Sequence, residues 1–148
     1  MLDNCISAKE RWGGVNNIID RWLEERQQLL VKYCALSGTE QREDKLKEVC
    51  QILVDYVSAG HFEIYDQLIK EGRDFQDKEA LQEAGALYTA IDKTTEKLLD
   101  FNDKYLETDD LSSLDDDLSR LGETLETRFA AEDRMIAVLH TSHKDLVT

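Results

Sequence analysis

The stretch LVDYVSAGHFEIYDQLI, residues 53–69, decides the fold class because its apolar residues recur with the period of an α-helix. One stripe, at spacings of three and four residues, consists of Leu53, Val57, His61, Ile64 and Leu68. We expect this stripe to face a core. His61 is its one polar member, and we expect it to be a core histidine that hydrogen-bonds across helices.

A second stripe of the same helix carries Asp55, Ser58 and Phe62, which combine an acid, a small residue and an aromatic off the core stripe. The small residues at 58–60 have two interpretations. They thin the helix surface so that a partner helix can approach beside Asp55 and Phe62, or they allow close helix packing inside the bundle.

The helical period recurs in three further blocks, and each block is about 30 residues long, or roughly 45 Å of helix. The four sets of apolar positions are Val15, Ile19, Trp22, Leu29, Tyr33 and Leu36; Leu46, Val49, Leu53, Val57, Ile64 and Leu68; Leu81, Ala84, Tyr88, Ile91, Leu98, Phe101 and Tyr105; and Leu118, Leu121, Leu125, Phe129, Ile136 and Leu139. The chain contains no proline, which suits long uninterrupted helices. These features predict an all-α, antiparallel four-helix bundle of long helices.

Short connections separate the blocks. Gly38 is expected to end the first long helix and Thr39 to cap the second. Gly72 is expected to end the second block, with Asp74 or Asp77 capping the third.

The Gly13-Gly14 pair is expected to separate a short N-terminal helical segment from the first long helix. No repeat or linker divides the chain, so residues 1–148 are predicted to form one domain.

Charge narrows the function. With 18 basic and 32 acidic side chains, the net charge is −14, which disfavours contact with nucleic acid or anionic membranes. It favours a basic partner, such as a protein whose basic face meets DNA, unless the acids only keep a small protein dispersed. The N-terminus does not resemble a secretory signal and no apolar run is long enough for a membrane span, so we expect a cytoplasmic protein.

Residues for metal or catalytic chemistry are sparse. Cys5, Cys34 and Cys50 are widely spaced and form neither a disulfide framework nor a zinc motif. None of the three histidines follows a glutamate at the spacing of a di-iron bundle, and His140-x-x-His143 has no evident third ligand. We therefore expect no metal, no cofactor and no enzyme activity. The competing class is a helical-bundle sensor that binds a metal or a small molecule.

Two charged residues fall on core stripes. Arg26 lies between Trp22 and Leu29, and Glu132 lies between Phe129 and Ile136. Because a buried charge needs a partner, Arg26 and Glu132 are predicted to pair if the first and last helices are antiparallel neighbours.

Three stretches closely resemble the Rsd/AlgQ family of bacterial anti-sigma factors. They are ERWGGVNNIIDRWLEERQQLLVKYCAL (10–36), CQILVDYVSAGHFEIYDQL (50–68) and LSRLGETLETRFAAEDRMIAVLH (118–140). By the same resemblance, the connection at 37–46 looks shorter than in members of that family. The resemblance implies a cytoplasmic bundle that binds the C-terminal region of the housekeeping sigma factor. That region reads the promoter −35 element and docks on RNA polymerase, so its capture would lower housekeeping transcription. A monomer in a 1:1 complex is the expected form.

The resemblance also assigns contacts by position. Asp55 matches a family acid associated with sigma binding, Ser58 and Phe62 follow on its stripe, and IIDRWL (18–23) supplies the rest. The expected partner-binding residues are Asp55, Ser58, Phe62, Ile18, Arg21 and Trp22. Trp22 is equally well interpreted as a core residue.

Overall fold

The computed structural model describes residues 2–38 and 40–147, with side chains described from residue 10 onward. Within these residues the elements are helical: α1 (Leu2–Ala35), α2 (Arg42–Ala59), the π-helical turn η1 (Gly60–Ile64), α3 (Tyr65–Asp74), α4 (Lys78–Glu107), α5 (Leu114–Leu139), the 3-10 turn η2 (Thr141–His143) and α6 (Lys144–Val147). Thr39, the expected cap, and the side chain of Cys5 lie outside the described residues.

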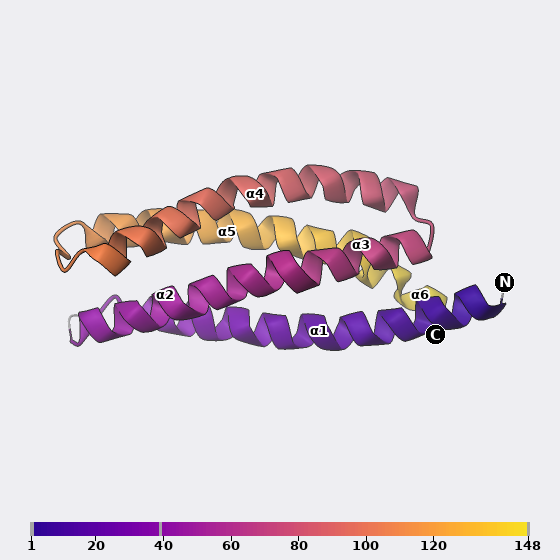
Figure 1. Cartoon of the computed structure of the whole chain (residues 1–148), viewed down its shortest axis with the longest axis horizontal. Helices are drawn as coiled ribbons and strands as arrows, with labels where there is room; N and C mark the ends of the chain where they lie inside the picture. Colours follow the sequence, from indigo (N-terminus) through magenta and orange to yellow (C-terminus); the bar gives the residue numbers. More distant parts are fainter. Residues whose placement is uncertain (1, 39, 148) are drawn as a thin grey trace.

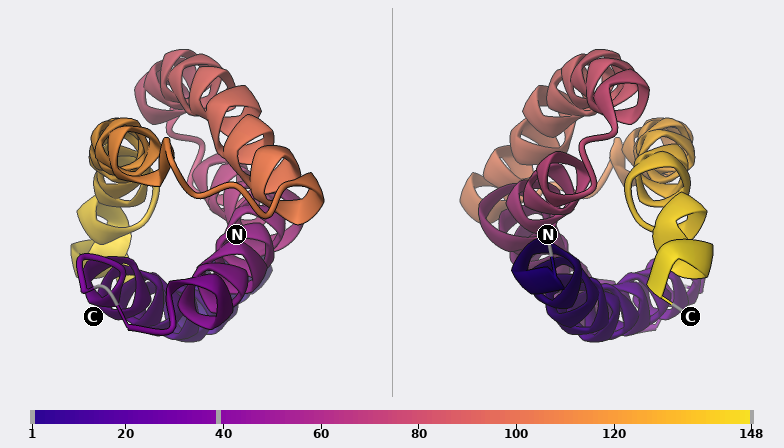
Figure 2. Two further views of the ribbon diagram at one scale, coloured as in Figure 1. Left: turned by 90° about the vertical axis from the view of Figure 1, so that its left-hand side faces the viewer. Right: turned by 90° about the vertical axis from the view of Figure 1, so that its right-hand side faces the viewer.

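The helices form four rods, because α2, η1 and α3 follow one another without a break. Figure 1 shows successive rods running in opposite directions, with both termini at the same end of the molecule. The two end views in Figure 2 show the rods arranged in a ring, in the order α1, α2 with α3, α4 and α5. The prediction of an all-α, antiparallel four-helix bundle is confirmed. No helix among the described residues combines the length and the apolar character needed to span a membrane.

The N-terminal segment is helical, but the expected break at Gly13-Gly14 is wrong: α1 runs through both glycines. Glycine inside a helix costs about 1 kcal/mol relative to alanine, so it weakens the helix without ending it. The residues just before the pair are held by other elements. Arg11 pairs with Asp74 of α3, and the indole N–H of Trp12 donates to the carbonyl oxygen of His140 at 2.9 Å.

The π-helical turn changes which residues of the second rod face the core. The backbone N–H of Tyr65 donates to the carbonyl oxygen of Gly60, a bond that spans one residue more than an α-helical bond does. The extra residue shifts the buried stripe, so Gly60 is buried and His61 is exposed. The prediction that His61 sits in the core is therefore wrong. Its bond across helices is present at the surface, where Nδ1 lies 3.2 Å from the hydroxyl of Tyr88 on α4.

Gly60 serves packing inside the bundle. A Cβ atom there would lie 2.9 Å from the hydroxyl oxygen of Tyr65 and 3.1 Å from the ring of Trp22. Because this glycine faces inward, it does not thin the outer surface for a partner. Of the two interpretations of residues 58–60, the structure supports close helix packing for Gly60.

The helix ends agree only partly with expectation. Asp77 caps α4, because its carboxylate accepts from the backbone N–H of Ala80 at 3.1 Å. Gly72 does not end a helix: it lies inside α3, buried against Leu81 and Leu139. The helix α3 ends at Asp74, two residues after the glycine at which it was expected to end.

Candidate functional site

The outer crest of the second rod carries the three residues predicted from the second stripe. Asp55 is exposed and Ser58 is half-buried. Phe62 is 79% exposed, the highest exposed fraction of any large apolar side chain among the residues that the structure describes. The ring of Phe62 packs edge-on against His61, with centroids 4.9 Å apart. The π-helical turn thus presents an aromatic side chain to solvent, one turn beyond Ser58. We call Asp55, Ser58 and Phe62 the α2 crest.

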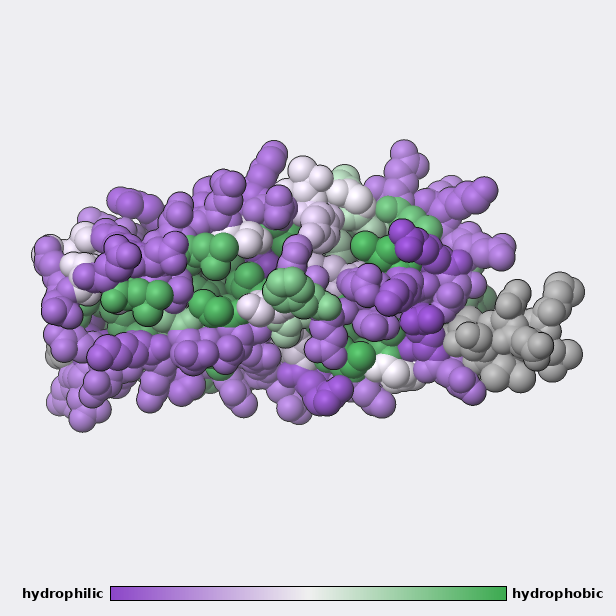
Figure 3. Space-filling view, in the orientation of Figure 1, coloured by the Kyte–Doolittle hydropathy of each residue, from purple (hydrophilic) through white to green (hydrophobic). Residues whose placement is uncertain are grey.

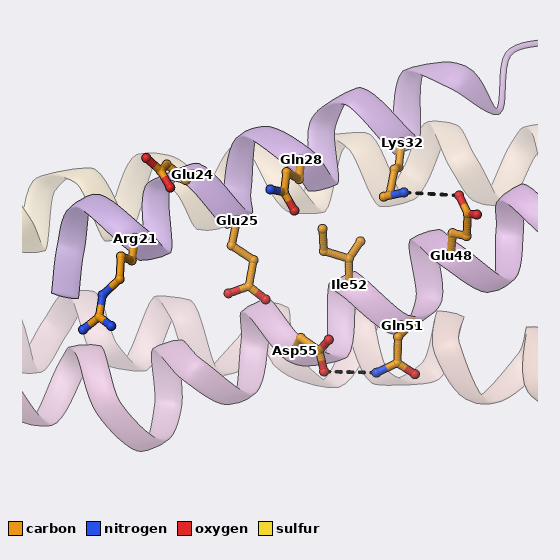
Figure 4. Close-up of a pocket in the computed structure, with 9 residues that line it drawn as sticks. All are labelled: Arg21, Glu24, Glu25, Gln28, Lys32, Glu48, Gln51, Ile52 and Asp55. Atoms are coloured by element: carbon orange, nitrogen blue, oxygen red, sulfur yellow. Dashed lines mark hydrogen bonds and ion pairs between the residues drawn. The ribbon is translucent and has the colours of Figure 1, made fainter. Parts of the chain in front are cut away.

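A groove of about 500 Å³ lies between α1 and α2, beside the α2 crest. Its lining residues are Arg21, Glu24, Glu25, Gln28, Lys32, Glu48, Gln51, Ile52 and Asp55. Figure 4 shows Glu25 reaching from α1 towards α2, whereas Asp55 lies on α2, where its carboxylate accepts from the side-chain amide of Gln51 at 3.1 Å. At one end Lys32 pairs with Glu48 at 3.2 Å. Four acids face two bases here, so the groove carries net negative charge.

One carboxylate of this groove, that of Glu25, is perturbed by its surroundings. The pKa of Glu25 is raised, mainly by partial burial and further by the nearby charge of Asp55. A raised pKa means that the ionised form of Glu25 is disfavoured where it stands. A cation placed between Glu25 and Asp55 would relieve that cost, so the groove suits an Arg or Lys side chain.

A smaller hollow of about 170 Å³ continues the groove along α1 towards the π-helical turn. Ile18, Arg21, Ala59 and Glu63 are among its lining residues, so the structure brings the IIDRWL stretch beside the turn. Ile18 is half-buried and Arg21 is exposed. The groove and the hollow share Arg21, and Asp55 of the α2 crest lines the groove. Figure 3 shows apolar residues exposed among hydrophilic ones on the side of the molecule that is drawn in Figure 1.

Trp22 belongs to the core. It is 2% exposed, its indole N–H donates to the carbonyl oxygen of Tyr56 at 3.1 Å, and its ring stacks on that of Tyr56 with centroids 4.7 Å apart. Burial leaves too little of the ring for a direct contact with a partner. Of its two interpretations, the structure supports the core role, in which Trp22 holds the floor of the hollow.

Arg26 and Glu132 pair as predicted, and they belong to a larger buried network than the sequence indicated. Arg26 contacts Glu132 at 3.4 Å and Asp133 at 2.6 Å. Glu132, which is 1% exposed, also accepts from the hydroxyl of Tyr56 at 2.6 Å. The contact of Tyr56 with Glu132 was not predicted from the sequence, although Tyr56 lies one helical turn after Leu53 of the core stripe.

Arg128 is the main participant that was missed. Its Nε lies 3.3 Å from Glu132, and Nη1 donates to the hydroxyl of Thr94 at 2.9 Å. Tyr65 contacts both Arg128 and Glu132. Burial raises the pKa of Glu132, and Arg128 and the tyrosine hydroxyls oppose that shift. The signal was available, because Arg128 is four residues before Glu132 and lies on the same helix stripe.

A second buried polar cluster joins the C-terminal end to α3 and α4. Glu71, which is fully buried, accepts from Nδ1 of His140 at 2.6 Å and lies 3.1 Å from Nδ1 of His143. Nε2 of His143 lies 3.0 Å from Asp77. Glu71 thus lies beside both histidines, and its carboxylate is hydrogen-bonded to both rings. Among the residues the structure describes, no group of three or more His, Cys, Asp and Glu is arranged to hold a metal ion.

The fold and this face define a helical bundle with an acidic groove beside an exposed aromatic, which is the composition of a protein-interaction surface. The particular family follows from sequence. Residues 1–140 match the family described as regulator of RNA polymerase sigma(70) subunit, Rsd/AlgQ, and the chain belongs to that family.

Similar proteins carry a consistent name. The chain is 39% identical to a "Regulator of sigma D" from Enterobacter sp. (strain 638), over 93% of this chain and 89% of that protein. It is 35% identical to the protein of the same name from Yersinia pseudotuberculosis, over 92% and 87% of the two chains. A "Regulator of sigma D" from Salmonella newport is 34% identical, over 98% and 95%.

Proposed function

We propose that this protein is an anti-sigma factor that binds the C-terminal, −35-reading region of the housekeeping sigma factor. By covering that region it blocks contacts with promoter DNA and with core RNA polymerase, and so regulates transcription. It acts in the cytoplasm, by binding in a 1:1 complex, and it uses neither a cofactor nor catalysis. The family membership of the chain supports the choice of sigma factor as partner.

The observation that carries the choice of surface is the α2 crest beside the acidic groove. A domain that reads DNA presents Arg and Lys side chains on its reading face, because these side chains contact phosphates and base edges. Glu25 and Asp55 are placed to accept hydrogen bonds from such side chains. Phe62 supplies an exposed aromatic ring, the kind of residue that often dominates binding energy at an interface.

Calorimetry with the isolated C-terminal region of the sigma factor tests the partner. We expect binding that weakens when salt is raised from about 0.1 M to about 0.4 M, because screening reduces the attraction between opposite charges. No heat of binding at either salt concentration would overturn the proposal.

Variants test the surface. Asp55→Ala and Phe62→Ala should each cost about 1–3 kcal/mol of sigma binding and leave the unfolding midpoint almost unchanged, because both side chains are exposed. Val57→Ala is the control, since Val57 is buried and should lose stability first. If both crest variants bind like the parent, the sigma factor binds a different face.

A further inference from the structure

The ring of rods has one seam that is bridged by side chains. Figure 2 shows α1 and α5 as neighbours in the ring, on the opposite side of α1 from α2. Among the described residues, no Cα atom of α1 lies within 8 Å of a Cα atom of α5, whereas such close pairs join α1 to α2 and α4 to α5. Side chains of α1 therefore span the distance to α5.

Two side chains of α1, which we call the struts, reach across to α5. Tyr33 donates its hydroxyl to the carbonyl oxygen of Leu118 at 2.6 Å. Gly122 makes room for it, because a Cβ atom there would clash with the hydroxyl oxygen of Tyr33. The second strut is Arg26, which pairs with Asp133 at 2.6 Å. The struts are seven residues apart on α1, or two helical turns and about 10 Å.

Between the struts the seam is hollow and apolar. A slot of about 420 Å³ opens there, within the ~300–1,000 Å³ range of ordinary ligand sites. Leu30, Leu125, Phe129 and Ala130 provide its apolar walls. The guanidinium of Arg26 lies 4.5 Å from the centre of the Phe129 ring, beside this wall of the slot.

Acids border the slot. Glu126 and Asp133 both line it from α5, and both are exposed. They are seven residues apart, so they lie on the same face of α5, two turns from one another. A helix laid along the seam would present a Lys or Arg side chain to Glu126, and a second one seven residues away would share Asp133 with Arg26. The apolar walls would accept side chains from the intervening turn.

We propose that the α1/α5 slot docks a basic amphipathic helix of a protein partner, at a site separate from the α2 crest. The helix inserts apolar side chains between Arg26 and Tyr33 and sets a cation against Glu126. The net charge of −14 favours the approach of such a helix, and the apolar walls fix its orientation. Since α1 lies between the two sites, a bundle carrying both could hold a sigma factor and a second partner.

A designed peptide is the probe. It has roughly 14 residues, or four turns, with Leu at positions i, i+3 and i+7 and two Lys residues seven positions apart. Fluorescence polarisation should detect binding of the labelled peptide to the full chain. A matched peptide with Glu in place of both Lys residues should bind at least about tenfold more weakly.

Protein variants locate the site. Glu126→Lys reverses the charge at the rim, and Ala130→Trp fills the slot from an exposed position. Each should weaken peptide binding by about tenfold or more. Glu96→Lys is the matched control, because it makes the same charge change at an exposed position on α4 and should leave peptide binding unchanged.

Sigma binding, measured on the same variants, separates this inference from the proposed function. We expect Glu126→Lys to bind the sigma C-terminal region like the parent. If it loses both ligands, the slot is part of the sigma surface and the inference of a separate site is overturned. Equal peptide binding by all variants, or no peptide binding to the parent, would also overturn it.

Discussion

At the scale of single residues, Glu132 concentrates most of the polar contacts of the core. Two arginines and two tyrosine hydroxyls surround its carboxylate, and these reach it from α1, α2, α3 and α5. A buried carboxylate is costly unless its oxygens are satisfied. The network therefore fixes how the helices align, and the arginines contribute unequally to it.

Arg128 should matter more than Arg26 for stability. Arg128 is 1% exposed, and its removal leaves Glu132 without its most buried cation, so Arg128→Ala should cost about 3–5 kcal/mol. Arg26→Ala should cost about 1–2 kcal/mol, because Glu132 keeps Arg128 and both hydroxyls. Urea unfolding of both variants measures the difference. Equal losses would show that the two arginines carry the charge of Glu132 equally.

Asp77 should make part of the stability sensitive to acid. Its hydrogen bond with His143, and then its bond from the N–H of Ala80, lower its pKa from 3.8. A carboxyl group with a lowered folded pKa stabilises the fold above its unfolded pKa and loses that contribution as pH falls towards the folded value. Asp77→Asn keeps a capping side chain but cannot ionise.

The comparison of the two proteins across pH isolates this effect. The parent should unfold at a higher temperature than Asp77→Asn at pH 7, and the difference should shrink as the pH falls below 3.8. A difference that stays constant over this range would mean that the charge of Asp77 contributes nothing to it.

At the scale of elements, glycines have opposite roles in two helices. Gly60 faces the Trp22 and Tyr65 rings, whereas a Cβ atom on Gly85 of α4 would meet nothing within 4 Å. Gly60→Ala should therefore destabilise the protein by about 1–3 kcal/mol through overpacking. Gly85→Ala should stabilise it by about 0.5–1 kcal/mol, because alanine favours the helix. Thermal unfolding of the pair tests this, and a stable Gly60→Ala would place that glycine outside the packed core.

The sequence predicted most of this element structure, and the failures have identifiable causes. The helical period and the absence of proline were enough to predict four long helical rods. When each rod must bury one apolar stripe, few arrangements of the rods other than a bundle remain. A regular helical period cannot indicate the π-helical turn, and it therefore predicts a buried His61. The added residue of the turn buries Gly60 and exposes His61 instead. The Gly13-Gly14 pair does not break α1, because contacts of Arg11 with α3 and of Trp12 with His140 outweigh local helix propensity.

The sequence predicted residues of the candidate site but not the groove that they border. Exposure of Asp55 and Phe62 followed from their positions off the core stripe, and the structure bears it out. The acidic groove could not be foreseen, because it depends on how α1 and α2 align. Whether the predicted residues bind a sigma factor stays a prediction.

At the scale of the whole molecule, the excess of acids acts against folding. With 32 acidic and 18 basic side chains, like charges repel across the surface of the bundle. Raising salt from about 0.02 M to about 0.3 M shortens the screening length and should raise the melting temperature by a few degrees. The same change should weaken sigma binding. A melting temperature that falls with salt would show that ion pairs outweigh the repulsion, and the effect should disappear near the isoelectric pH.

The π-helical turn also determines where the second rod tolerates a lost residue. Figure 1 shows that rod spanning the length of the bundle, and both of its halves contact other helices. Deleting one residue from an α-helix rotates everything beyond it by about 100°, which would turn buried residues of α3 towards solvent. A deletion within residues 60–64 instead converts the wide turn into an ordinary one and leaves α2 and α3 facing the same neighbours. We therefore expect a chain that is one residue shorter at this turn to fold into the same bundle, with the exposed aromatic as the feature most easily lost.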